Sequence, residues 1–271
     1  ANSRSHMAAN TELLLGHNVS IANNITLAGI ATIGFAPLEV EYLIVGGGGG
    51  SGGGQSGVVY NAPGGGGAVV LGSGSVGSAS STVTVGAAGA RNVVGVGGTS
   101  SFLGTNALGG WSGGRDTDNN LLIGRGGASA SGNIGGTRNG YASGGAGGHT
   151  TAGSNAPTGT QGGAGGAGLA STITGSSVKY GFGGGGRNAT NWGLSGDGVT
   201  GKANAPANTG GGAPADYNAA AGVVVVRYAS STALASGGSL TTFNGDDTIG
   251  ENGVTYQVHS FTSTGSSTFS V

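Results

Sequence analysis

Glycine is concentrated in one continuous stretch of this chain. Of its 67 glycines, 57 lie between Gly46 and Gly212, where they recur as short runs separated by other small residues. Ordering a glycine costs more backbone conformational entropy than ordering any other residue. A folded structure for this stretch therefore needs a source of stability other than a core of large side chains.

Three structures are compatible with such a stretch: a packed bundle of polyglycine II helices, a flexible Gly/Ser linker, and a conventional glycine-rich β structure. Collagen is excluded because glycine does not occur at every third position and proline is scarce. An extended helix with three residues per turn makes no internal hydrogen bonds, so neighbouring chains without Cβ atoms can bond to one another directly. The strand-like residues at Thr82–Val85 and Ser100–Leu103 argue against a linker. We therefore favour the bundle.

Both flanks of the glycine-rich stretch show the patterns of β-strands. Glu39–Val45 passes from alternating to fully apolar residues, and Val223–Tyr228 is an apolar run of strand length. Thr255–Phe261 alternates apolar and polar residues. Neither flank shows a helical pattern. The predicted fold is an all-β base with a glycine-rich bundle of polyglycine II helices and essentially no α-helix.

These patterns divide the chain into four parts. The opening letters are typical of a cloning remnant, and the alternating residues that follow suit an attachment segment. The predicted parts are a cloning remnant at residues 1–7, a β attachment segment at 8–37, a β base at 38–45 and 213–271, and a polyglycine II bundle with binding loops at 46–212.

Composition excludes several classes of partner. Only 7% of residues are charged and the net charge is -1, so no large basic field is available to attract nucleic acid. No apolar run approaches the ~20 residues of a membrane span, which predicts no membrane insertion. The absence of cysteine removes disulfides and thiolate metal sites. We expect neither a cofactor nor a metal.

Motifs that suggest enzymes fail on inspection. Gly46–Ser51 imitates a dinucleotide-binding turn, but neither a helix pattern nor a carboxylate follows it. Gly49–Gly53 imitates a nucleophile elbow, but so glycine-rich a composition produces that pattern by chance, and the histidines have no evident Asp partner. Gly196–Ala203 resembles a P-loop in which alanine replaces the residue that would hold Mg²⁺. Asp116–Asn120 begins like a calcium loop but lacks the glycine that must follow, and Asp246–Glu251 suits a hairpin turn. The chain is predicted not to be an enzyme.

The segments between the glycine runs carry most of the large side chains of the middle region. Aromatic and arginine residues dominate binding hot spots, and Tyr, Ser, Gly and Asn suit adaptable binding surfaces. Alternatively, the aromatic rings only seal the ends of the bundle. The candidate receptor-binding residues are Trp111, Arg115, Arg138, Tyr141, His149, Tyr180, Phe182, Trp192 and Tyr217.

An ordered set of short strings carries a resemblance to a known family. The strings are VEYLIV before the first glycine run, TVTVG at residues 82–86, GTSSF at 98–102, YGFGGGG at 180–186, TGGG at 209–212, VVVVRY at 223–228 and HSFTSTGSSTFSV at the end. From about residue 38 to 271, the chain resembles a glycine-rich domain common in phage tail and virion proteins. In that domain a string like HSFTSTGSSTFSV tends to precede the first strand. Here it either closes the base or begins a truncated repeat.

The glycine runs also resemble those of the tip adhesins of T-even-type phages. Those proteins cap a tail fibre and bind surface proteins or sugars of bacteria through loops between glycine runs. The resemblance implies a phage tail-fibre tip adhesin on the virion, extracellular, that recognises a bacterial surface receptor, either an outer-membrane protein or a polysaccharide. The rest of the fibre would attach through the N-terminal segment.

Other functions remain in competition with the adhesin. A structural glycine-rich protein of a cell surface would lack a specific receptor and would self-associate. An ice-binding bundle needs a flat face of small side chains, which irregular loops carrying Trp and Arg disfavour.

Overall fold

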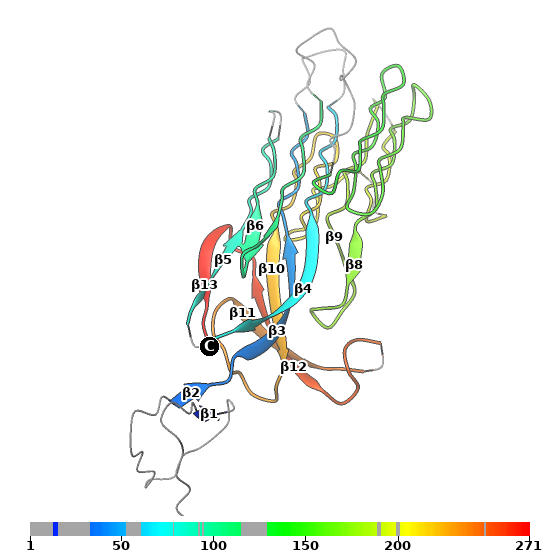
Figure 1. Ribbon diagram of the computed structural model, residues 1–271. Helices are drawn as coiled ribbons and strands as arrows, with labels where there is room; N and C mark the ends of the chain where they lie inside the picture. The colour runs from blue at the N-terminus through cyan, green and yellow to red at the C-terminus, as the bar shows by residue number, and fades with distance from the viewer. Residues whose placement is uncertain are drawn as a thin grey trace, which may run out of the picture.

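The computed structural model combines a base of β-sheets with a long bundle of glycine-rich segments (Figure 1). It describes residues 13–15, 33–52, 61–77, 79–91, 93, 95–114, 129–188, 191–198, 201–246 and 248–271. Within these residues every regular element is a β-strand, and none forms an α-helix. The prediction of an all-β protein is confirmed.

Thirteen strands are formed by the described residues. They are β1 (Leu13–Leu15), β2 (Ile33–Phe35), β3 (Leu38–Val45), β4 (Val69–Val76), β5 (Ser81–Val85), β6 (Ser100–Phe102), β7 (Thr105–Ala107), β8 (Leu169–Ser171), β9 (Val178–Tyr180), β10 (Val223–Ala229), β11 (Ser239–Asn244), β12 (Thr255–Phe261) and β13 (Gly265–Phe269).

The base is built on a five-stranded antiparallel sheet in the order β11-β12-β10-β3-β4. Its central strands β3 and β10 are apolar on both faces over Tyr42–Val45 and Val223–Val226, where both faces of the sheet are covered. One face packs on a four-stranded sheet in the order β13-β5-β6-β7. The other face packs on the hairpin of β8 and β9.

Aromatic rings fill the space between the two larger sheets. Tyr42 on β3 meets the ring of Phe102 edge-on at 5.7 Å between centroids, and Phe102 meets Phe269 in the same way at 5.9 Å. Phe102 and Phe269 are almost fully buried. Such pairs contribute stability beyond the burial of their area. The base therefore has an ordinary side-chain core.

The C-terminal string HSFTSTGSSTFSV closes the base. Its first residues belong to β12, which pairs with β10, and its last residues form β13, which pairs with β5. Phe269 on β13 has no exposed surface. The string therefore closes the base and does not begin a truncated repeat, the other possibility that the sequence allowed.

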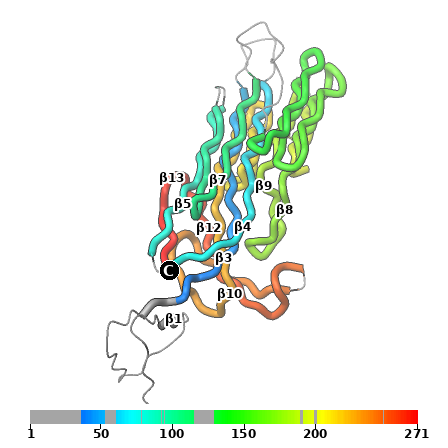
Figure 2. Tube along the Cα trace, in the orientation of Figure 1, coloured from blue at the N-terminus to red at the C-terminus, as the bar shows by residue number. Residues whose placement is uncertain are grey.

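The bundle starts where β3 runs directly into the glycine segment 46–52 (Figure 2). The backbone N–H groups of this segment donate hydrogen bonds to three neighbouring segments in turn, with a period of three residues. The donors and their carbonyl acceptors are Gly46 to Ala68, Gly49 to Gly65 and Gly52 to Ala62, then Gly47 to Gly98 and Gly50 to Gly95, and finally Gly48 to Ala220, at 2.8 to 3.0 Å.

Three further segments approach the Cα atoms of segment 46–52. A Cβ atom placed on Gly46, Gly49 or Gly52 would collide with the backbone of segment 108–114, and one on Gly47 or Gly50 would collide with segment 87–90. A Cβ atom on Gly48 would collide with Gly211. Segment 46–52 therefore packs against six segments, all through backbone atoms.

The same period of three recurs in the second half of the bundle. Ser143, Ala146 and His149 donate their N–H groups to the carbonyls of Arg187, Gly184 and Gly181 at 2.8 to 2.9 Å. A repeat of three residues is the period that the predicted polyglycine II helices would have, and those helices stay a prediction. The carbonyls of the glycine segments also lie where Cα–H···O contacts add weaker support.

The division of the chain differs from the one that glycine density predicted. Residues 213–222 belong to the bundle, since Ala213, Ala220 and Gly222 bond to Gly49, Gly211 and Gly86. The base in turn takes β4 to β9 from the glycine-rich stretch. Glycine occurs where two backbones approach closely, and its density therefore does not give the boundary between bundle and base. Along the chain, bundle segments alternate with strands of the base.

Most of residues 1–37 lie outside the described residues. The two short strands that are described there, β1 and β2, pair in parallel.

Candidate functional site

Among the described residues, short turns lie at the end of the bundle far from the base. We call this region the tip; it comprises turns 138–142, 157–161 and 214–217 together with residues 187, 188, 191 and 192. Each turn joins an outgoing glycine segment to a returning one. Asn139 and Ala142 exchange two hydrogen bonds of 3.0 Å, and Tyr217 donates its N–H to Pro214 at 3.0 Å.

Asparagine side chains connect adjacent turns of the tip. The Asn139 amide donates to the carbonyl of Pro157 at 3.5 Å. The amides of Asn188 and Asn191 donate to the carbonyls of Gly159 and Thr160, at 3.4 and 2.9 Å. Side-chain amides thus hold these turns as one continuous surface, in the way that Asn commonly bonds loop backbone.

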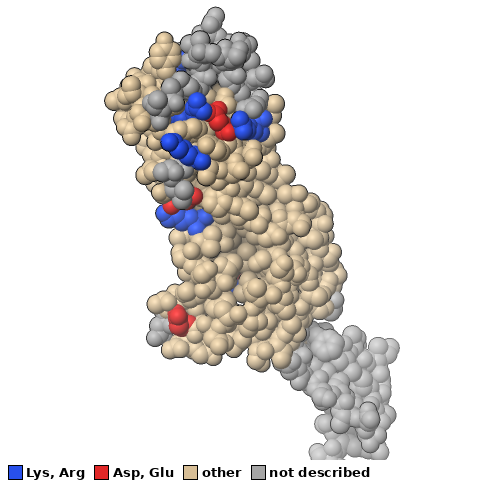
Figure 3. Space-filling model, turned by 180° about the vertical axis from the view of Figure 1, so that it is seen from behind, with Lys and Arg blue, Asp and Glu red and all other residues tan. Residues whose placement is uncertain are grey.

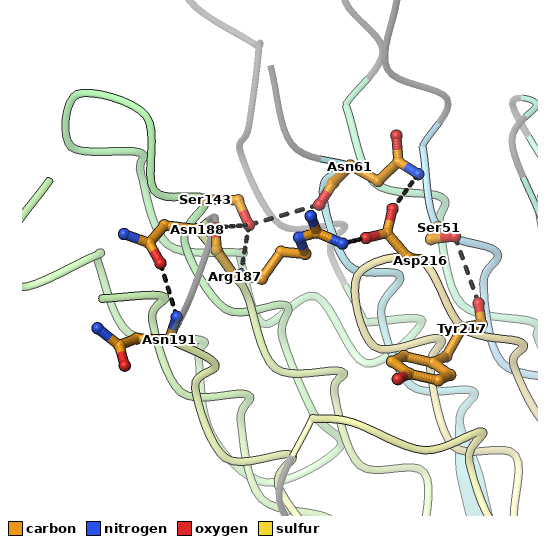
Figure 4. Close-up of polar contacts among 8 residues, drawn as sticks. All are labelled: Ser51, Asn61, Ser143, Arg187, Asn188, Asn191, Asp216 and Tyr217. Atoms are coloured by element: carbon orange, nitrogen blue, oxygen red, sulfur yellow. Dashed lines mark hydrogen bonds and ion pairs between the residues drawn. The ribbon is translucent and has the colours of Figure 1, made fainter. Parts of the chain in front are cut away.

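An ion pair lies at the centre of a cluster just below this surface (Figure 4). Arg187 pairs with Asp216, and the Asn61 amide also donates to the Asp216 carboxylate. The side chains of Arg187 and Asp216 are each 22% exposed. The pair is therefore shielded from water and is stronger than a fully exposed one.

Two aromatic rings complete this cluster. The guanidinium carbon of Arg187 lies 4.9 Å from the centre of the Trp192 ring, which is a cation–π distance. The Trp192 and Tyr217 rings are 5.3 Å apart. Ser143 adds hydrogen bonds to the backbone of Arg187 and Asn61 at 2.9 to 3.4 Å. We call Arg187, Asp216, Trp192, Tyr217, Asn61 and Ser143 the tip clip, because together they join segments from four parts of the chain.

Several predicted contact residues do present surface. Tyr141 is 66% exposed on the turn that also carries the exposed Arg138. Trp111 is 59% exposed on the side of the bundle, in segment 108–114. Trp192 and Tyr217 are half-buried in the tip clip. Arg115 lies outside the described residues.

Two predicted contact residues are interior instead. Tyr180 is 4% exposed in the core between the five-stranded sheet and the β8–β9 hairpin, and Phe182 is 1% exposed with its ring against Gly211. Both lie where the hairpin enters the bundle, so they pack rather than face a partner. The prediction that they contact a receptor was wrong for this reason.

His149 is also far from the tip. It lies at the junction of bundle and base, where its Nδ1 accepts hydrogen bonds from the N–H of Val69 at 3.1 Å and from the hydroxyl of Ser131 at 2.6 Å. Partial burial lowers the pKa of His149 below its usual value. A neutral His149 therefore accepts a hydrogen bond from Val69 and holds the start of β4 in place.

The residues that sequence analysis missed are the polar partners in the clip. Asp216, Asn61 and Ser143 are short polar residues in a region full of them. A Pro-Ala-Asp-Tyr string at 214–217 does signal a turn, and Asp216 adopts a φ of 67° there. Nothing local to the sequence, however, pairs Asp216 with Arg187.

Acidic and histidine side chains do not gather into a metal site in the described part of the chain. The described residues contain no group of three or more His, Cys, Asp or Glu side chains placed to hold a metal ion. Asp246 accepts hydrogen bonds from the side chain and backbone of Thr248 and from Ile249, which hold the pKa of its carboxyl below the usual value. This is the solvated hairpin turn that was expected. No helix among the described residues is long and apolar enough to cross a membrane.

A depression opens on the surface of the base. It has a volume of about 440 Å³ and opens between the five-stranded sheet and the turn that follows β8. Glu41 and Arg227, which form an ion pair, line it together with Leu71, Ser73 and Thr172. It is remote from the tip.

Comparison with known proteins places the chain in a family. The sequence model of a glycine-rich domain matches residues 26–229, three quarters of the chain. The chain belongs to this glycine-rich domain family. The match begins before β3 and ends with β10, so it covers the whole bundle and leaves out β11 to β13. Neither the curated proteins nor the solved structures contain a match to the chain.

Proposed function

We propose that this chain is the receptor-binding tip of a phage tail fibre, acting on the outside of the virion. The observation that carries the proposal is the tip itself. A stalk of backbone-packed segments holds a set of connected turns away from the base, and the exposed Tyr141 and Arg138 lie on one of these turns. A pre-ordered aromatic and arginine surface binds with little loss of conformational entropy.

The distribution of charge supports the same orientation. Residues 46–222 contain seven Lys and Arg against four Asp, a net charge of +3. Residues 38–45 and 223–271 contain one Arg against five Asp and Glu, a net charge of -4. Figure 3 shows Lys and Arg gathered toward the bundle end of one face. An anionic bacterial surface would attract the bundle end and repel the base.

The base is suited to attachment. Its sheets lie at the opposite end from the tip, and the chain enters β3 from residues 33–37 on that side (Figure 1). The N-terminal segment would therefore lead to the rest of the fibre. The partner at the tip is a bacterial outer-membrane protein or polysaccharide.

The experiment is binding of the labelled chain to a panel of Gram-negative strains, with and without protease or periodate treatment of the cells. We expect selective binding to a few strains, and the treatment that abolishes it identifies the receptor as protein or glycan. The double variant Arg138→Ser with Tyr141→Ser should weaken binding at least roughly tenfold. Leu240→Ser, at an exposed position on β11, is the matched control and should bind normally.

A structural, self-associating surface protein is the competing function. One observation favours it: Val93, Val96, Leu108 and Trp111 are 45% to 59% exposed on segments that lie side by side. Each pair is three residues apart, which places it on one face of a three-residue helix. Sedimentation decides between the two. Concentration-dependent assembly that Trp111→Ser abolishes, together with no binding to any strain, would replace the adhesin with this function.

A further inference from the structure

The chain contains three Asn-Gly dipeptides: Asn139-Gly140, Asn244-Gly245 and Asn252-Gly253. Asparagine before glycine is chemically labile, because the glycine nitrogen can attack the side-chain amide carbon and no side chain on the glycine hinders the approach. The attack requires a glycine nitrogen that is not held by a hydrogen bond. The three pairs differ in this respect.

In two of the pairs, both in the base, the glycine N–H is hydrogen-bonded. Gly245 is buried, and its N–H donates to the carbonyl of Val254 at 2.8 Å. The N–H of Gly253 donates to the carbonyl of Gly245 at 3.2 Å. Each nitrogen must first lose its bond through local opening before it can react.

The third pair stands at the tip with its glycine nitrogen free. Asn139 and Gly140 are both exposed, and among the described residues the Gly140 N–H has no hydrogen-bond partner. The turn explains this. Asn139 and Ala142 form its hydrogen-bonded ends, and Gly140 is its first central residue with a φ of 55°. A two-residue turn of this kind directs the N–H of that residue outward, to solvent.

We propose that Asn139 is a site of spontaneous deamidation at the tip. The Gly140 nitrogen loses its proton and forms a bond to Cγ of Asn139, and the side-chain nitrogen leaves as ammonia. The resulting cyclic imide adds one water, and opening at one or the other carbonyl gives aspartate or isoaspartate. One water is consumed and one ammonia released, with no change of oxidation state.

The product alters the surface on which the proposed function depends, although the reaction itself does not depend on that function. A new carboxylate appears next to Arg138 and two residues from Tyr141. Isoaspartate also lengthens the backbone by one carbon inside a turn whose ends are tied together. As the reaction proceeds over time, the net positive charge of the tip would fall and the geometry of turn 138–142 would change.

The test is peptide mapping by mass spectrometry after the folded full-length chain is kept at mildly alkaline pH. Asn139 should deamidate roughly tenfold faster than Asn252 or Asn244, the factor expected from one protecting hydrogen bond. In denaturant the three rates should converge, which makes the other two pairs internal controls. Asn139→Gln should remove the reaction at this position.

Equal rates at the three pairs in the folded chain, or a faster reaction at Asn252, would overturn the proposal. A difference that persists unchanged in denaturant would also overturn it, since the cause would then be local sequence rather than the fold.

Discussion

The base and the bundle are stabilised by different atoms. In the base, Phe102, Phe269 and the valines of β10 fill the interior, and the sheets serve to position them. In the bundle, Gly48 and its neighbours pack backbone against backbone, with no side chain between. A side-chain core is damaged by removing atoms, whereas a backbone core is damaged by adding them. The two regions therefore respond in opposite ways to substitution.

Removal of a ring from the base should have the largest effect. Phe269 is fully buried against Phe102, Phe261 and His259. Phe269→Ala should lower the free energy of unfolding by about 3–5 kcal/mol, the cost of a large cavity. Urea unfolding measures this. A loss under about 1 kcal/mol would mean that β13 does not close the base.

Addition of one methyl group to the bundle should have a comparable effect. A Cβ atom on Gly48 would meet only backbone atoms of Gly211 and Gly212, which cannot move aside. Gly48→Ala should therefore cost about 3 kcal/mol. In an ordinary loop the same change is neutral or stabilising.

Gly77→Ala is the matched control for that substitution. Gly77 follows β4, is exposed, and has no atom within 4 Å of where its Cβ would lie. Its unfolding free energy should change by less than about 0.5 kcal/mol. Equal effects of Gly48→Ala and Gly77→Ala would refute a backbone core.

The tip clip should give an intermediate effect. Asp216→Ala leaves the guanidinium of Arg187 half-shielded without its carboxylate, which should cost about 1–2 kcal/mol, between exposed and buried pairs. The double variant Asp216→Ala with Arg187→Ala should cost less than the sum of the two single changes. Strict additivity would show that the pair does not interact.

Acid should produce the smallest effect and should act in both regions. Burial lowers the pKa of His259 in the base, opposed by a hydrogen bond to Gly237, and burial lowers that of His149 at the junction. The folded pKa values lie below the unfolded value of 6.5, so the unfolded chain binds more protons. The free energy of unfolding should fall as pH drops below about 6.5.

The two histidines can be separated by substitution. His259 is 1% exposed and accepts from the hydroxyl of Tyr228, whereas His149 is partly exposed. His259→Asn should therefore flatten the pH dependence more than His149→Asn does. Unfolding curves above and below the ordinary histidine pKa measure the slope. The reverse order would place the main pH sensitivity at the junction.

The fold could be predicted where local patterns decide it. Glu39–Val45, which passes from alternating to apolar residues, and the segment Val223–Tyr228, which begins with four valines, were predicted to be strands; they lie in β3 and β10. Clustered glycine indicated a core made of backbone, and the glycine segments do pack backbone against backbone. The limits of the bundle could not be predicted, because β4 contains Gly72 and Gly74 and still pairs fully with β3. The pairing of β4 with β3 joins segments that are far apart in the sequence, and the glycines of β4 do not reveal it.

The candidate site was only partly accessible from sequence. Tyr141 and Trp111 were predicted to be contact residues between the glycine runs; the structure exposes both, Tyr141 on a turn and Trp111 on the side of the bundle. Tyr180 and Phe182 look the same in the sequence, but both are buried. Tyr180 ends β9 in the core on the face of the sheet, and Phe182 packs inside the bundle against Gly211. An aromatic ring in such a chain can be buried only where a neighbouring segment leaves room for it. Gly211 leaves this room beside Phe182 because it has no side chain.

The backbone-only packing has an evolutionary consequence. A glycine segment offers the same atoms to every neighbour, so its fit does not depend on the identity of the turn that follows it. Turns such as 138–142 and 157–161 can thus change in length or sequence without any compensating change in the interior. A chain of this kind can diversify its outer surface while its scaffold stays constant, a freedom that a side-chain core such as that of the base does not allow.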